Sequence, residues 1–363
     1  MISVSGLGIR LGNFNLKNIS LYVDDGKCLT IIGPNGSGKT ILLECIAGLH
    51  RPLDGRILVD EVEVTNLPPE KRRIGYVPQD FMLFPHLTAD KNIAFGLRDT
   101  NGKRVDEARK IMHLLGIEHL VERDVRTLSA GEKQKVALAR ALAVNPKGLL
   151  LDEPLSALDP LARRKLQKEL KSALTEILHT LDLPVIYVTH DLLEAQVMSD
   201  QIAVMNNGSI EQVGSRDEVL ENPRSKFVAE FLGFNVFDGR VISVKDNMAF
   251  VEVEGIVIQA EGNDVTPGED VTVVLKPQDV FLSSQSEGSK PKWQHCQCNI
   301  IKGSITEICR TGPLARIAVD AGIPLWSEIG ASSLDESDIE MRSTVYVQFK
   351  ASRTKMIRKR DDS

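Results

Sequence analysis

Eight consecutive residues, GPNGSGKT at positions 33–40, constrain this sequence more than any other stretch. They fit the pattern G-x-x-x-x-G-K-[ST] and stand between a compact apolar run, KCLTIIG, and a run with helical periodicity, TILLECIAGL. Glycines let backbone N–H groups curl around phosphate oxygens, and the helix that follows offers its positive N-terminus to the same anion. The stretch therefore predicts a nucleotide-phosphate site on an α/β core.

The residues of this loop have separate expected roles. We expect Lys39 to meet the β- and γ-phosphates of a nucleoside triphosphate, and Thr40 to supply a hydroxyl to Mg²⁺. A glycine-rich turn without a ligand is the alternative, and the strand and helix on either side argue against it. The other candidate phosphate-binding residues are Gly33, Pro34, Asn35, Gly36, Ser37 and Gly38.

A second part of the site follows another apolar run, GLLLDEP. The runs KCLTIIG, GLLLDEP and PVIYVTH are predicted to be buried parallel strands. Asp152 and Glu153 come at the carboxyl end of the second run, where such sheets bind ligands. We expect Asp152 to act on Mg²⁺ and Glu153 to orient and polarise the attacking water. An Asp-Glu pair after a strand is commonly only a helix start, but the phosphate-binding loop upstream favours hydrolysis.

The stretch LSAGEKQK, residues 128–135, predicts a second anion-binding helix end. Ser129 and Glu132 fit an S-x-x-E capping box for a helix that continues through Leu142. Ala130 and Gly131 leave the N-terminus of this helix unobstructed. The plainer interpretation is that the box merely starts a helix.

Six elements together resemble the ATPase subunit of ABC transporters, in order and in spacing. The resemblance covers residues 1 to about 232, and it implies an α/β, ABC-type P-loop NTPase core with a helical subdomain. In that family two subunits clamp two ATP molecules head to tail, and the signature helix of one meets the γ-phosphate held by the other. The two predicted helix ends would then serve different sites. The six elements are GPNGSGKT, Gln79 in YVPQD, LSAGEKQK, LLLDEP, SALD and His190 in VTHD.

The resemblance also implies individual roles. Gln79 would contact Mg²⁺ or water and sense the membrane partner, and His190 would contact the γ-phosphate, although a lone histidine after a strand is more often a capping or core residue. Asp159 would lie at the subunit boundary. The family usually stacks an aromatic residue on adenine, and Leu11 occupies that place here, with Phe14 nearby. The nucleotide contacts supplied by the signature stretch would be Ser129, Gly131 and Glu132.

Two domains are expected, at 1–233 and 234–363. From about Asn235 the sequence is strand-rich and contains a weak repeat, whose halves span about 236–284 and 296–357 and end in strands that run into Lys276 and Lys350. The repeat predicts an all-β domain of paired small barrels of the oligonucleotide/oligosaccharide-binding type. The basic-then-acidic tail SRTKMIRKRDD is expected to be a solvated end.

The second domain resembles one branch of the family through GRVISV, GIPLWSEI and VYVQFKAS. These stretches are similar to the ATPase subunit of molybdate/tungstate importers, in which a regulatory domain binds the tetrahedral oxyanion and inhibits transport. The resemblance implies a site made by Asn299, Lys350 and Ser352. A dianion needs a cation with convergent hydroxyl and N–H donors, and we expect Lys350 and Ser352 to share a strand face. Cys296 and Cys298 stand where the family has Ser and Arg.

Composition narrows the remaining classes. A net charge of −6 argues against a nucleic-acid partner. No apolar run approaches the roughly 18–20 residues of a membrane span, so another chain would cross the membrane. Five cysteines without a secretory signal indicate reduced thiols in the cytoplasm, and the CQC pair has no recognised zinc spacing.

The sequence therefore predicts an ATPase subunit of an oxyanion importer at the cytoplasmic face of the membrane. Its expected ligands are ATP and Mg²⁺. Its expected partners are a second copy of itself, a multi-span permease and, indirectly, a solute receptor, with molybdate or tungstate as a regulatory ligand. Two alternatives stay open: an importer of sulfate, sugar or polyamine, and a soluble ABC ATPase outside transport. The choice between molybdate and tungstate also stays open.

Overall fold

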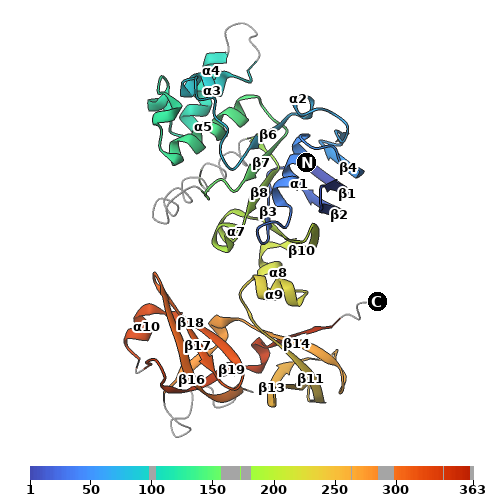
Figure 1. The fold of residues 1–363 in the computed structure, drawn as a ribbon, viewed down its shortest axis with the longest axis vertical. Coiled ribbons are helices and arrows are strands. Elements are labelled where there is room, and N and C mark those ends of the chain that lie inside the picture. The colour runs from blue at the N-terminus through green and yellow to red at the C-terminus, as the bar shows by residue number, and fades with distance from the viewer. Residues whose placement is uncertain are drawn as a thin grey trace. The chain divides into compact units, whose positions relative to one another are not determined.

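The computed structural model of the chain describes residues 1–97, 104–156, 172, 181–262, 264–284, 298–337 and 339–359. The chain forms two compact units, Met1–Asn222 and Pro223–Ser363 (Figure 1). The sequence-based boundary after residue 233 lies inside the second unit, because α9 (Lys226–Phe231) packs against β11 (Asn235–Lys245).

A six-stranded sheet forms the centre of the first unit. The three predicted buried parallel strands are confirmed as β3 (Cys28–Ile32), β7 (Gly148–Asp152) and β8 (Val185–Thr189). All three are buried along their whole length, and β8 pairs in parallel with both of the others. Burial on both faces explains why these runs are apolar without alternation. In order, the strands are β10 (Ser209–Ser215), β9 (Gln201–Asn206), β3 (Cys28–Ile32), β8 (Val185–Thr189), β7 (Gly148–Asp152) and β6 (Ile74–Val77).

A second, antiparallel sheet packs against the side of α1 (Lys39–Ala47) that faces away from the central sheet. Side chains of α1 such as Leu42 and Ile46 are fully buried between this sheet and one face of the central sheet. The helix after the phosphate-binding loop is thus fixed by a core on both sides. In order, the strands are β2 (Phe14–Val23), β1 (Ile2–Leu11), β4 (Asp54–Val59) and β5 (Val62–Glu63).

The predicted helical subdomain is formed by α3, α4 and α5, which gather at one end of the first unit (Figure 1). Apolar residues of α5 share a core with Leu149 and Tyr187 on the opposite face of the central sheet.

Within the described part of the chain, no helix is long and apolar enough to cross a membrane. Besides α1, the helices among the described residues of this unit are α2 (Pro69–Arg72), α3 (Ala89–Ala94), α4 (Arg104–Leu114), α5 (Ala130–Ala143), α7 (Leu192–Met198), α8 (Arg216–Glu221) and the 3₁₀ turns Glu118–Leu120 and Val125–Thr127.

The second unit contains two five-stranded antiparallel sheets over one apolar core. Their strand orders are β13-β12-β11-β14-β20 and β18-β17-β16-β19-β15, so the two halves of the repeat have the same topology. The interpretation as paired small barrels stays a prediction. The strands are β11, β12 (Met248–Val253), β13 (Ile256–Glu261), β14 (Asp270–Leu275), β15 (Phe281–Ser283), β16 (Cys298–Thr311), β17 (Leu314–Asp320), β18 (Pro324–Gly330), β19 (Thr344–Lys350) and β20 (Lys355–Arg358), with the helix α10 (Ala331–Asp335).

Each half gives its last strand to the sheet of the other half. β15, at the end of the first half, pairs with β19, and β20, at the end of the second half, pairs with β14. The expectation that the tail is solvated is therefore wrong for Lys355–Arg358. These residues make main-chain hydrogen bonds with β14, which the charge pattern of the tail does not predict.

The exchange is reinforced by two buried asparagines at equivalent positions. Asn299 on β16 accepts a hydrogen bond from the main chain of Gln259 at 2.7 Å and donates one to it at 2.9 Å. Asn235 on β11 makes the same pair with the main chain of Trp326, at 2.7 and 2.8 Å. Each half thus holds the third strand of the other through one side-chain amide.

Candidate functional site

The phosphate-binding loop is packed so tightly that a side chain at either of two glycines would lie against neighbouring atoms. A Cβ on Gly33 would lie 2.1 Å from the carbonyl oxygen of Met205. Gly38 has a φ of 102°, and a Cβ there would lie 2.5 Å from Cζ of Phe14. Space therefore excludes a side chain at Gly33, and at Gly38 it is mainly the positive φ that favours glycine.

The side chain of Lys39 points back into this loop. Its Nζ donates to the carbonyl oxygens of Gly33 at 2.9 Å and Pro34 at 3.0 Å. Burial lowers the pKa of Lys39, while the charges of Glu153 and Asp152 act in the opposite direction. The loop thus encloses a buried cation, which suits a polyanionic ligand.

Asp152 lies at the end of β7 with both carboxylate oxygens engaged. Thr40 Oγ1 donates to Oδ1 at 3.2 Å, and the hydroxyl of Tyr76 donates to Oδ2 at 3.4 Å. The residue is 1% exposed, and burial raises the pKa of its carboxyl to about 6. A hydroxyl and a carboxylate together are the hard oxygen ligands that Mg²⁺ prefers, so the donor set fits that ion. Sequence reasoning missed Tyr76, because a tyrosine inside a strand carries no functional signal.

Glu153, the next residue, brings together the three predicted catalytic side chains. Gln79 Nε2 donates to its Oε2 at 3.4 Å, and His190 Nδ1 lies 3.1 Å from its Oε1. The backbone of Glu153 has a φ of 43°, a left-handed conformation that is uncommon outside glycine, and its N–H donates to Val188 of β8. This main-chain bond holds the turn that aims the carboxylate at the other two groups.

Ser156 was not predicted and joins this cluster. Its hydroxyl donates to the carbonyl oxygen of Glu153 at 2.8 Å, and Gln79 Nε2 donates to the hydroxyl at 3.4 Å. It belongs to the stretch SALD, whose predicted subunit-boundary residue Asp159 lies outside the described residues.

The helix end at α5 has the predicted capping box. Ser129 Oγ accepts from the N–H of Glu132 at 3.3 Å, and the N–H of Ser129 donates to Glu132 Oε2 at 2.8 Å. No hydrogen bond between described residues joins Ser129 or Glu132 to Glu153. Gly131 lies in the first turn of the same helix. The structure therefore leaves the signature stretch and the Glu153 cluster as separate groups of one chain.

Leu11 and Phe14 lie directly opposite each other at the end of the β1–β2 hairpin. Both are partly buried against the core that holds α1, and the ring of Phe14 lies against Gly38. An apolar surface with one aromatic ring thus borders the phosphate-binding loop. The contact between Leu11 and adenine stays a prediction.

The predicted oxyanion residues lie near one another in the second unit, but not as expected. Asn299 is opposite Phe349 in the β16–β19 pair, next to the pair of Cys298 with Lys350. The expectation that Lys350 and Ser352 share a strand face is wrong, because β19 ends at Lys350 and Ala351–Arg353 form a 3₁₀ turn.

Two contacts explain this turn. Ala351 is 1% exposed, so it is buried in the core, and its carbonyl oxygen accepts from the N–H of Thr354 at 3.1 Å. Ser352 is exposed at the surface of the turn. The side chain of Asn299 is already bonded to Gln259, and Cys296 lies outside the described residues.

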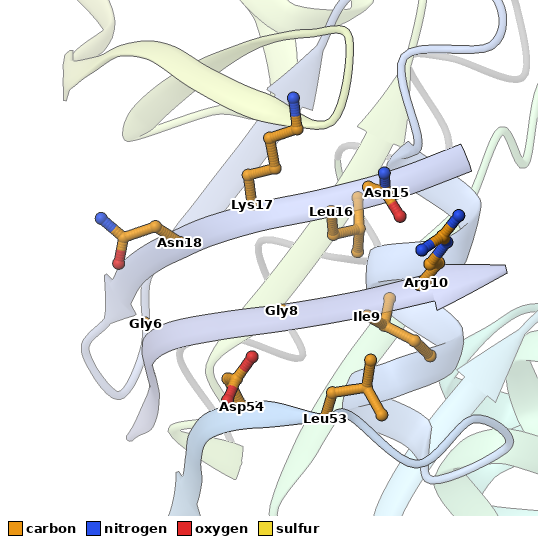
Figure 2. A pocket seen from close by; sticks show the side chains of 10 residues that line it. All are labelled: Gly6, Gly8, Ile9, Arg10, Asn15, Leu16, Lys17, Asn18, Leu53 and Asp54. Atoms are coloured by element: carbon orange, nitrogen blue, oxygen red, sulfur yellow. The ribbon is translucent and has the colours of Figure 1, made fainter. Parts of the chain in front are cut away.

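A pocket of about 470 Å³ lies on the antiparallel sheet, apart from the predicted site residues. Gly6 and Gly8 contribute no side chains, so the face of β1 is hollowed between β2 and the start of β4 (Figure 2). Figure 2 shows Arg10 and Asn15 at one end of the hollow and Asn18 at the other. The remaining lining residues are Ile9, Leu16, Lys17, Leu53 and Asp54.

The family model described as "ABC transporter" matches residues 16–156. Among curated proteins, the chain is similar to the molybdate/tungstate import ATP-binding protein WtpC of Pyrococcus abyssi, with 39% identity over 98% of this chain and 100% of that protein. WtpC of Methanocaldococcus jannaschii is 45% identical over 77% of this chain and 99% of its own length. The spermidine/putrescine import ATP-binding protein PotA of Legionella pneumophila is 38% identical over 92% of this chain and 91% of its own length.

Solved structures of ATP-binding cassettes resemble part of this chain. The dimeric ATP-binding cassette MJ0796 in a post-hydrolysis state with ADP and Pi is 30% identical, with a TM-score of 0.52 over 60% of this chain and 99% of that one. A nucleotide-free ATP-binding cassette from an ABC transporter is 25% identical, with a TM-score of 0.57 over 64% of this chain and 98% of that one.

Proposed function

The chain belongs to the ABC transporter family as an ATP-binding subunit of an import system, and on that premise we propose that it drives uptake of molybdate or tungstate through a partner permease. Because the chain belongs to this family, it is an ATPase whose activity is coupled to transport. In the proposal it works as a homodimer at the cytoplasmic face of the membrane, where ATP binding closes the dimer and moves the permease.

The observation that carries the catalytic part is the position of Glu153 between Gln79 and His190. A carboxylate held by two groups is fixed in one rotamer, which is what orienting a water for in-line attack requires. His190 and Lys39 would lie against the γ-phosphate and stabilise the charge that spreads over its oxygens. The signature residues Ser129, Gly131 and Glu132 would serve the nucleotide held by the partner subunit, and Asp159 would lie at the boundary between the two.

Thr40 and Asp152 would hold Mg²⁺, with Gln79 nearby. When bound, the ion would neutralise charge on the β- and γ-phosphates. The remaining chemistry belongs to side chains of this chain. Glu153 accepts the proton of the attacking water, and the glycine-rich loop from Gly33 to Gly38 holds the phosphates through its N–H groups.

The catalytic proposal is tested by Glu153→Gln in the full chain. The substitution keeps the side chain's size and removes the base, so we expect ATP hydrolysis to fall by about a hundredfold or more, with ATP still bound and an ATP-dependent dimer accumulating on size-exclusion columns. Glu122→Gln, an exposed exchange of the same kind in the helical subdomain, is the control. Unchanged steady-state hydrolysis in Glu153→Gln would refute the role of the carboxylate.

The cargo proposal is supported by the WtpC relatives and by a cation in the predicted regulatory site. Lys350 would attract an oxyanion and repel a polyamine, whereas the PotA relatives favour polyamine import as the second candidate. The amide nitrogen of Asn299 has a second N–H besides the one that it donates to Gln259. This N–H and the hydroxyl of Ser352 would complete the anion site, with N–H groups of the turn after Lys350 as further donors.

Two measurements separate these candidates. Isothermal titration of the full chain with tungstate, molybdate, sulfate and spermidine tests the regulatory site, and Lys350→Gln should weaken only oxyanion binding. Uptake of the same solutes by vesicles that contain the chain with its permease tests the cargo. Uptake of spermidine without uptake of either oxyanion would overturn the proposal and favour the second candidate.

A further inference from the structure

Glu194 is a buried carboxylate that none of the roles above uses. It lies in the first turn of α7 and is 2% exposed. Its Oε2 accepts two hydrogen bonds, from the hydroxyl of Tyr187 at 2.9 Å and from Thr189 Oγ1 at 2.8 Å. Burying a carboxylate is costly unless it is hydrogen-bonded, so these two donors help to stabilise it in its buried position.

The two donors come from β8, the strand that ends just before His190. Tyr187 is fully buried in β8, and Thr189 is the last residue of that strand. Burial and the neighbouring charge of Glu194 raise the pKa of the Tyr187 hydroxyl, so it remains a donor at every working pH. Both bonds therefore run from the end of β8 to one oxygen on α7.

A second set of bonds fixes the other side of His190. The N–H of Asp191 donates to Thr189 Oγ1 at 3.0 Å, and Asp191 Oδ1 accepts from the N–H groups of Leu193 at 2.8 Å and Glu194 at 3.2 Å. The hydroxyl of Thr189 thus donates a hydrogen bond to Glu194 and accepts one from the N–H of Asp191.

His190 lies between Thr189 and Asp191, which these hydrogen bonds hold in place. Its own side chain is 44% exposed and reaches the carboxylate of Glu153, which is 13% exposed. An exposed imidazole on a loose loop would sample many positions, and a displacement of about 1 Å can cost about a hundredfold in rate. The buried bonds below His190 limit that freedom.

We propose that Glu194 is a positioning residue, which aligns His190 by anchoring the chain on both sides of it through Thr189 and Asp191. The inference rests on the proposed function, because it gives His190 a contact with the γ-phosphate. A carboxylate suits this place better than an amide, since a charged oxygen accepts the two hydroxyl bonds more strongly than an amide oxygen does.

The test compares Thr189→Val, Thr189→Ser and Glu194→Gln in the full chain. We expect Thr189→Val and Glu194→Gln to lower kcat by about tenfold to a hundredfold and to raise KM for ATP by no more than about tenfold, and Thr189→Ser to retain activity because it keeps the hydroxyl. Thr30→Val makes the same exchange on the neighbouring strand β3 and is the matched control, expected to stay within about twofold.

A double-mutant cycle separates positioning from general support of the fold. In a His190→Ala background, Thr189→Val should change kcat by less than about twofold, since there is no imidazole left to align. A full additional loss in that background would overturn the proposal. Unchanged kcat in His190→Ala alone would overturn both the proposed role of His190 and this inference. A loss in His190→Ala with none in Thr189→Val or Glu194→Gln would overturn the inference alone.

Nucleotide binding gives a readout that does not depend on turnover. In the Glu153→Gln background, Thr189→Val should weaken binding of ATP by about threefold to tenfold and leave ADP unchanged, because only ATP has the γ-phosphate. Equal weakening of both nucleotides, measured by equilibrium titration, would indicate a general structural effect and contradict the proposal.

Discussion

Replacing Asp152 by asparagine should stabilise the first unit while it abolishes hydrolysis. Burial raises the pKa of this carboxyl from 3.8 to about 6, and each pKa unit corresponds to about 1.4 kcal/mol. The raised value means that the folded protein prefers the neutral acid. Ionisation at neutral pH therefore lowers the free energy of unfolding by about 2–3 kcal/mol. Asparagine is neutral and can still accept from Thr40, so most of this loss is recovered.

The direction of this pKa shift determines how the free energy of unfolding depends on pH. The stability that protonated Asp152 contributes is present below about pH 4 and is lost as pH rises through about 6. The difference between Asp152→Asn and the unchanged chain should therefore grow by about 1.4 kcal/mol between pH 5 and pH 8. Urea unfolding in EDTA, followed by circular dichroism, measures this difference, with the exposed Asp54→Asn as control. A variant less stable than the unchanged chain at pH 8, or a difference independent of pH, would refute the reasoning.

Three further predictions concern packing. Arg72→Ala removes four hydrogen bonds from a buried guanidinium to main-chain carbonyls and should cost about 3 kcal/mol in urea unfolding; a loss below about 1 kcal/mol would contradict this. Asn235→Ala and Asn299→Ala should each destabilise the second unit by about 2 kcal/mol, read by tryptophan fluorescence, and widely different losses would argue against equivalent roles. Gly208→Ala puts a Cβ 1.9 Å from the carbonyl oxygen of Asn15 and should lower Tm by several degrees, so an unchanged Tm would exclude the clash.

Much of the nucleotide site could be predicted because its residues follow buried parallel strands. The carboxyl ends of such strands meet at one edge of a sheet, so Asp152, Glu153 and His190 had to lie close together. The capping box at Ser129 and Glu132 is local and depends only on spacing. These are the features for which short-range sequence information is sufficient.

Features that depend on tertiary contacts could not be predicted in this way. The strand at Lys350 ends because Ala351 turns into the core, which no alternation pattern reveals. Glu194 reads as an ordinary acidic residue in the first turn of a helix, and only the fold shows it buried against Tyr187. In the same way, the charged tail gives no sign that Lys355–Arg358 complete a sheet.

The exchange of β15 and β20 has a consequence for how the second unit forms during synthesis. The sheet that begins with β11 lacks its edge strand until β20 has left the ribosome, after nearly all of the second half has been made. Until then β14 is an unpaired edge strand of the first half, and the sheet is completed only when β20 pairs with it. A stop codon placed just before Lys355 would thus damage the earlier-made half, which then exposes an edge strand prone to pairing between chains.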